Sequence, residues 1–247
     1  MVQPGSLLFL CIGVLTLIFF AIPVFWPGNK VNGLWYVSVP VLFVAFFAVY
    51  FHDIIGGNPQ RFLLSWVPSL NVNLSFYLDG LALFFVLLIT GIGCLVFLYA
   101  AGYIEAGKRS KFYAYLIFFM LSMIGIVVAD NLVLIYLFWE LTSVSSFLLI
   151  GFKHQEKEAR DSALQALLVT GIGGLSILAG LLMLGSWLGT FEMSEIIQLS
   201  PDQSDPRFVS SLLLIAFGAF TKSAQYPFQF WLPDAMAAPT PVSAYLH

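Results

Sequence analysis

The stretch NLVLIYLFWELTSVSSFLLIGF, residues 131–152, decides the fold class of this chain. It is long enough to cross a bilayer as a single helix, because a transmembrane helix needs about 20 mostly apolar residues. Its one ionisable side chain is Glu140, with nine residues of the stretch before it and twelve after it. The stretch therefore predicts a membrane span with a carboxyl group near its middle.

The composition extends this prediction to the whole chain. Of 247 residues, 60% are hydrophobic and only 9% are charged, whereas soluble domains carry about 25% charged residues. The sequence therefore predicts an all-α polytopic membrane protein. The net charge is −3 and no basic cluster is interleaved with aromatic residues, which argues against nucleic-acid binding. Cys11 and Cys94 lie in apolar runs, and no phosphate loop, haem-ligand pair or metal-ligand cluster is visible, so neither a cofactor nor a metal is expected.

Seven runs have the length and apolarity of membrane spans. They cover residues 6–26, 33–51, 79–103, 112–129, 131–152, 162–188 and 208–228. An eighth span is expected to start near Thr240, because Pro241 suits the first turn of a helix. The sequence stops at His247, about two turns into that helix. We therefore expect the sequence to be the N-terminal part of a longer chain.

The basic residues between the spans predict the orientation. The loops after the first, third, fifth and seventh runs hold seven basic residues: Lys30, Lys108, Arg109, Lys111, Lys153, Lys157 and Arg160. The opposite side holds only Arg61 and Arg207. Cytoplasmic loops carry the excess of Lys and Arg, so the N-terminus is predicted to lie outside the cell.

Residues 61–78, between the second and third runs, have a different pattern. From residue 71 to residue 78, polar and apolar residues alternate after Pro68, which predicts a short extracellular hairpin. An irregular interfacial loop is the alternative. Asp79 and Asp130 each stand at the start of a span, where a carboxylate can cap free backbone N–H groups. Capping is favoured over a direct functional role for both.

Two charges are predicted to lie inside spans. An ionisable group at mid-depth costs at least about 2.5–3.5 kcal/mol, so Glu140 is interpreted as an ion- or proton-handling residue, with a structural salt bridge as the alternative. Lys222 lies in the seventh run, shortly before Pro227. Proline removes a backbone hydrogen bond, so this helix is predicted to be discontinuous beside a polar cavity. For Lys222 the alternative is a side chain that snorkels to the interface.

Glu140 and Lys222 are the only opposite charges predicted at membrane depth. A pair in contact would hold both groups charged, and separating it would change their affinities for a proton. The sequence permits this switch without establishing contact. His247 is the only histidine in a predicted span, and its chemistry suits proton relay. A structural histidine is the alternative there.

Three motifs resemble one known family. They are NLSFYLDGLAL (residues 73–83), FWELTSVSSFLLIGF (residues 138–152) and TKSAQYPFQFWLPDAMAAPTPVSAYLH (residues 221–247). They look like the antiporter-like subunits of Mrp sodium/proton antiporters and of respiratory complex I, and details in the last motif favour the Mrp A subunit over complex I chain 5. By this resemblance, Glu140, Lys222 and His247 match charged relay positions of helices 5, 7 and 8.

The resemblance implies a non-enzymatic subunit of a multisubunit cation/proton antiporter in the bacterial plasma membrane. It would exchange cytoplasmic Na⁺ for external H⁺, with other subunits of the complex and the bilayer as partners. Residues 1–111 would hold the first three helices and the hairpin, and residues 112–247 most of the first antiporter repeat. The alternatives are a proton-pumping subunit of an NADH- or ferredoxin-linked oxidoreductase, and a membrane scaffold that does not transport.

Overall fold

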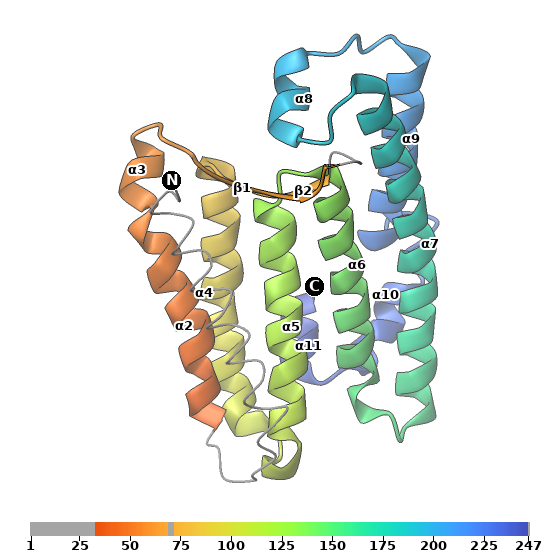
Figure 1. Ribbon diagram of the computed structural model, residues 1–247. Helices are drawn as coiled ribbons and strands as arrows, with labels where there is room; N and C mark the ends of the chain where they lie inside the picture. The colour runs from red at the N-terminus through yellow and green to blue at the C-terminus, as the bar shows by residue number, and fades with distance from the viewer. Residues whose placement is uncertain (1–32, 69–71, 247) are drawn as a thin grey trace.

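The computed structural model describes residues 33–68 and 72–246 as a row of helices with a hairpin across one end (Figure 1). The predicted first span, residues 6–26, and His247 lie outside the described residues. The longer helices are α2 (Gly33–Val49), α4 (Gly80–Tyr103), α5 (Arg109–Val128), α6 (Leu132–Ile150), α7 (Lys157–Leu188) and α9 (Pro206–Lys222). The short ones are α3 (Phe51–Ile55), α8 (Met193–Leu199), α10 (Trp231–Asp234) and α11 (Thr240–Leu246), with 3-10 turns η2 (Ala106–Lys108), η3 (Gly151–Lys153) and η4 (Ala235–Ala237).

Four helices of the described ranges are long and apolar enough to cross a membrane. They are Gly80–Tyr103, Ala106–Val128, Leu132–Lys153 and Lys157–Leu188. Two other predicted spans are shorter helices, since α2 and α9 have 17 residues each. The break after α9 has a local cause, because Ala224 has a left-handed backbone with φ of 52°. Such a residue cannot continue a right-handed helix.

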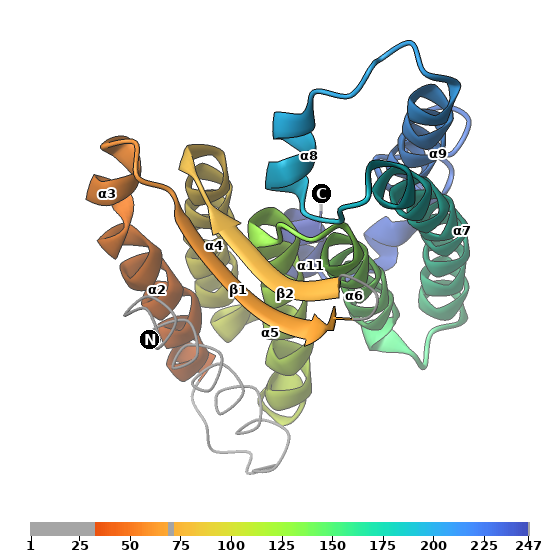
Figure 2. The same ribbon diagram turned by 45° about the horizontal axis from the view of Figure 1, so that its top comes forward.

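Strands β1 (Gln60–Val67) and β2 (Val72–Leu78) pair antiparallel where the sequence predicts a hairpin. Phe62 lies opposite Phe76 in the register, and their rings stack. Figure 2 shows both strands lying across the ends of α4, α5 and α6. The hairpin and α8 thus lie at one end of the helices, and the η2 and η3 turns lie at the other (Figure 1).

Polar side chains start the helices at the hairpin end. Asp79 caps α4 as predicted, because its carboxylate accepts a hydrogen bond from Ala82 N at 2.8 Å. The prediction for Asp130 is wrong. The adjacent Asn131 caps α6, with its side-chain oxygen 3.0 Å from Val133 N. Asp130 does not cap α6; its carboxylate binds Ser194 instead.

Helices α7 and α9 pack closely because small residues line their contact. A side chain at Gly180 would lie 2.7 Å from the Ser211 carbonyl oxygen. Gly218 of α9 similarly meets the backbone of Gly173 on α7. Small residues of this kind let membrane helices approach each other closely. The pair therefore holds the end of α9, which carries Lys222, against α7.

Candidate functional site

Glu140 lies in α6 and directs its carboxylate toward α7. A Cβ built at Gly174 would overlap Glu140 Oε1 and lie 3.0 Å from its Cδ, so the missing side chain of that glycine makes room for the carboxylate. Within the described part of the chain, Glu140 Oε1 is buried and has no hydrogen-bond partner. Buried polar atoms are usually paired. A lone carboxylate oxygen at this depth is therefore an available acceptor for a proton or a cation.

Lys222, the last residue of α9, reaches the hydroxyl residues of α6 that follow Glu140. Its Nζ donates hydrogen bonds to Thr142 Oγ1 at 2.9 Å and to Ser143 Oγ at 2.7 Å. The ammonium also lies 5.5 Å from the ring centroid of Trp139, within cation–π range. The lysine therefore points into the protein, which contradicts the snorkelling alternative.

The structure does not join Glu140 and Lys222 in an ion pair. Among the described residues, the ion pairs involve other side chains, while Lys222 binds neutral hydroxyls. Both residues nevertheless meet the same turn of α6, because Glu140 stands two and three positions before the hydroxyl residues that bind Lys222. The two predicted residues thus share one site without direct contact.

The end of α9 is fixed by residues that follow it. Trp231 of α10 donates a hydrogen bond from Nε1 to the Thr221 carbonyl at 2.9 Å. Thr221 is itself buried, and its hydroxyl donates to the Gly218 carbonyl at 2.7 Å. Lys222 stands in the last turn of α9, where the helix dipole favours a positive charge. These contacts set the position from which Lys222 reaches α6.

The third predicted site residue, His247, is outside the described residues, but the helix before it is placed. Tyr245 of α11 donates a hydrogen bond to the Ile89 carbonyl of α4 at 2.9 Å. Its hydroxyl lies against Gly93, where a side chain would come within 2.9 Å of it. Helix α11 also contacts α6. The segment leading to His247 is therefore packed between α4 and α6.

Sequence reasoning missed a second polar cluster, at the hairpin end. Arg61 of β1 lies 3.1 Å from Asp130 Oδ2 and 3.5 Å from Glu192 Oε2. Both carboxylates are buried, with 2% and 4% of the residue exposed. Ser194 holds the Asp130 carboxylate through its backbone N–H and its hydroxyl, each at 2.8 Å. We call Arg61, Asp130 and Glu192 the hairpin cluster.

Glu192 is the centre of the hairpin cluster. It accepts hydrogen bonds from Ser75 Oγ at 2.5 Å and from Asn73 and Asn131, each at 3.0 Å. Asn73 and Ser75 stand two apart in β2, so the alternation that predicted the hairpin also placed both on one face. Two features of the sequence could have indicated the cluster. They are the polar face of β2 and Arg61, one of the two basic residues predicted on that side of the membrane. The cluster ties the hairpin to the start of α6 and to the segment before α8.

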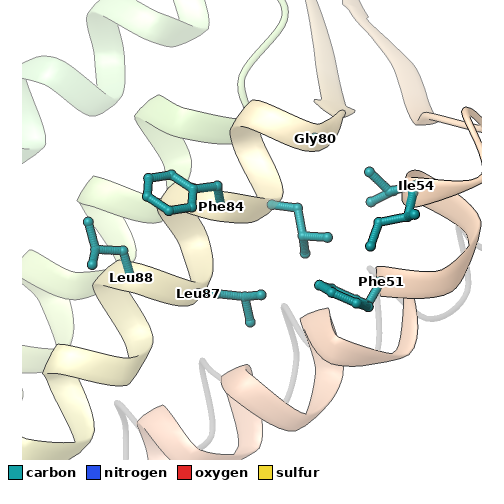
Figure 3. A pocket seen from close by; sticks show the side chains of 8 residues that line it. Phe51, Ile54, Gly80, Phe84, Leu87 and Leu88 are labelled. Atoms are coloured by element: carbon teal, nitrogen blue, oxygen red, sulfur yellow. The ribbon is translucent and has the colours of Figure 1, made fainter.

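The open pocket between α3 and α4 has no ionisable side chain in its lining. Figure 3 shows that its walls are almost entirely apolar; they are formed by Phe51, Ile54, Ile55, Gly80, Leu83, Phe84, Leu87 and Leu88. In the described ranges, no group of three or more His, Cys, Asp or Glu side chains is placed to hold a metal ion. The candidate site is therefore the contact of α6, α7 and α9.

Two protein-family models match parts of this chain, and one of them covers the α6, α7 and α9 site. Residues 129–247 match the family described as NADH:quinone oxidoreductase/Mrp antiporter, transmembrane part. Residues 64–113 match the N-terminus of NADH-ubiquinone oxidoreductase (complex I) chain 5. The chain belongs to the antiporter-like membrane subunits of this family. Glu140 and Lys222 both lie within the first match.

Two relatives are similar to this chain over most of its length. The Na⁺/H⁺ antiporter subunit A1 of Staphylococcus aureus is 46% identical over 216 residues, which cover 86% of this chain and 27% of that protein. The structure of the Mrp complex from Dietzia sp. contains a chain with a TM-score of 0.83 and 32% identity, over 96% of this chain and 26% of that one. The chain thus spans about a quarter of the length of these relatives.

The fold is also found in a respiratory complex. A chain of the membrane-bound sulfane sulfur reductase, an archaeal respiratory membrane complex, has a TM-score of 0.82 and 22% identity, over 98% of this chain and 49% of that one. At this identity the likeness concerns the fold alone. The same helix arrangement therefore occurs in an assembly named for redox chemistry and in one named for antiport.

Proposed function

We propose that this chain is part of an Mrp-type A subunit and serves a multisubunit antiporter that exchanges cytoplasmic Na⁺ for external H⁺. The observation that carries the proposal is the site between α6 and α9. Among the described residues, one buried carboxylate oxygen of Glu140 has no hydrogen-bond partner, and the nearby ammonium of Lys222 is bound by hydroxyls. Ionisable groups this costly at membrane depth mark ion and proton pathways.

Glu140, Lys222 and His247 are the relay residues of this proposal. Movement of the ammonium between the hydroxyls and the carboxylate would change the affinity of Glu140 for a proton or a cation. His247 would take the next position, since the preceding helix α11 lies against α6 and α4. The site is a relay of charge across the membrane centre, so the subunit performs transport and no bond chemistry.

The membrane arrangement is part of the same proposal. Lys108 and Lys153, in the turns opposite the hairpin, would face the cytoplasm of a bacterial cell. The hairpin and α8 would then lie outside, together with the N-terminus. Helix α9 and the short α10 would form one discontinuous seventh span around Lys222. Residues 1–111 would form the first unit and residues 112–247 most of the first antiporter repeat, with other subunits of the complex as partners.

The second candidate is a proton-pumping subunit of an NADH- or ferredoxin-linked oxidoreductase. Two observations favour it: the match of residues 64–113 to complex I chain 5 and the shared fold with a respiratory membrane complex. Redox chemistry in other subunits would then drive the same relay. Copurification of the complete complex with iron–sulfur subunits would support this candidate, and Na⁺-driven proton movement without a redox substrate would exclude it.

Exchange by the complete complex in membrane vesicles tests the proposal. Vesicles that carry the wild-type complex should show a Na⁺-dependent change in ΔpH, and Glu140→Ala or Lys222→Ala should abolish it. Glu158→Gln is the matched control, because this acidic residue is exposed in the first turn of α7, away from the site. Normal exchange by both site variants, at equal amounts of assembled complex, would favour the non-transporting scaffold instead.

A further inference from the structure

The ammonium of Lys222 lies in a small site built from one turn of α6. Two of its three donors go to Thr142 Oγ1 and Ser143 Oγ, and the ring of Trp139 lies on another side. Both hydroxyl residues are buried, with 3% and 0% of their surface exposed. Residues three and four apart share a face of a helix, so positions 139, 142 and 143 form one continuous surface.

The hydroxyls are oriented to accept from a cation. Thr142 Oγ1 donates its own hydrogen to the Trp139 carbonyl at 2.7 Å, and Ser143 Oγ lies 3.4 Å from the same oxygen. A hydroxyl has one donor and two acceptor lone pairs. With its hydrogen turned to the helix backbone, each hydroxyl presents lone pairs to Lys222. The site therefore suits an ammonium better than a neutral donor-acceptor group.

Glu140 belongs to the same turn but points elsewhere. Its carboxylate lies against Gly174 of α7, while Trp139, Thr142 and Ser143 face Lys222. One turn of α6 thus offers the ammonium two partners, a pair of neutral hydroxyls and a carboxylate. In this structure the hydroxyls are occupied, and Glu140 Oε1 has no partner among the described residues.

We propose that Trp139, Thr142 and Ser143 are positioning residues that hold Lys222 away from Glu140 and compete with that carboxylate for the ammonium. This inference rests on the proposed function. While the hydroxyls hold Lys222, the carboxylate is free to bind a proton or a cation. When the ammonium moves to Glu140, the carboxylate is occupied. The hydroxyls therefore set how often the relay opens.

Removal of the hydroxyls should favour an ion pair between Lys222 and Glu140. A hydrogen bond to a charged group is worth about ten-fold or more in an equilibrium, so Thr142→Val and Ser143→Ala should each raise the apparent KM for Na⁺ by about ten-fold. The maximal rate should change much less, because saturating Na⁺ displaces the ammonium from Glu140. Thr142→Ser and Ser143→Thr keep a hydroxyl and should retain exchange within about two-fold.

The control is Ser145→Ala, which removes a buried hydroxyl from the same helix. In the described part of the chain, Ser145 Oγ binds carbonyls of its own helix, at Leu141 and Thr142. All variants are measured in the complete complex, in vesicles with equal amounts of assembled protein. Ser143→Ala, the smallest change, decides the outcome if Thr142→Val does not assemble.

Two results would overturn the inference. A wild-type apparent KM for Na⁺ in the hydroxyl-free variants would show that the hydroxyls do not compete with Glu140. An equal rise of the KM in Ser145→Ala would show that any buried hydroxyl of α6 matters only for packing. Lys222→Ala separates this inference from the proposed function, because normal exchange without the lysine would refute the relay itself.

Discussion

Gly174→Ala should impair transport while leaving the protein assembled. The new methyl group would occupy the space of Glu140 Oε1, and it would lie 3.0 Å from Cδ before any adjustment. The obstacle is the end of a flexible side chain, so the carboxylate can rotate away and the helices need not separate. The expected effect is a lower transport rate, because displacing a reacting group by about 1 Å can lower a rate by about 100-fold.

The assay for this prediction is Na⁺-driven ΔpH in vesicles from cells that lack other antiporters. Gly171→Ala is the matched control, since it lies on the same helix and, apart from its chain neighbours and the adjacent backbone of α7, no described atom is within 4 Å of the added carbon. It should exchange at the wild-type rate, and Gly174→Ala should be slower by about 10-fold to 100-fold. Equal rates for both variants would refute the assignment of Gly174 as the space that positions the carboxylate.

Two stability predictions follow from other contacts. Gly180→Ala should destabilise the protein by about 1–3 kcal/mol, because the methyl group would lie 2.7 Å from the Ser211 backbone oxygen; thermal unfolding of the purified complex should show a loss that Gly171→Ala lacks. Arg61→Ala should cost about 1–3 kcal/mol, because two buried carboxylates lose their shared cation. Arg207→Ala removes an exposed ion pair and should shift the same transition less; an equal shift would contradict the role of the hairpin cluster.

The membrane fold could be predicted because apolar runs of sufficient length have few alternatives. The runs from Gly80 to Leu188 correspond to four helices able to cross a membrane. The capping role of Asp79 was also readable, since a carboxylate before an apolar run has a local task. Helix ends were harder. The end of α9 depends on the left-handed backbone at Ala224, which no periodic pattern announces.

The sequence indicated which charges lie deep in apolar runs, but it did not indicate their contacts. The depth of Glu140 and Lys222 in apolar runs made both visible, because charge is expensive there. Their lack of direct contact depends on how α9 packs on α7 and on the hydroxyls of Thr142 and Ser143, which are tertiary facts. The hairpin cluster was missed for the same reason. Arg61 and Glu192 are 131 residues apart in sequence and meet only in the fold.

The central claim is that Glu140 and Lys222 act as one unit, and a double-mutant cycle tests it most directly. Glu140→Asp and Lys222→Arg keep their charges but change reach, so each should leave a measurable rate of Na⁺-driven ΔpH formation by the complete complex. Residues that act together show interaction energies of about 0.5–3 kcal/mol, and about 1 kcal/mol corresponds to about five-fold in rate. The account predicts that the loss in the double variant differs from the product of the single losses by about five-fold or more. Losses that simply multiply would contradict it.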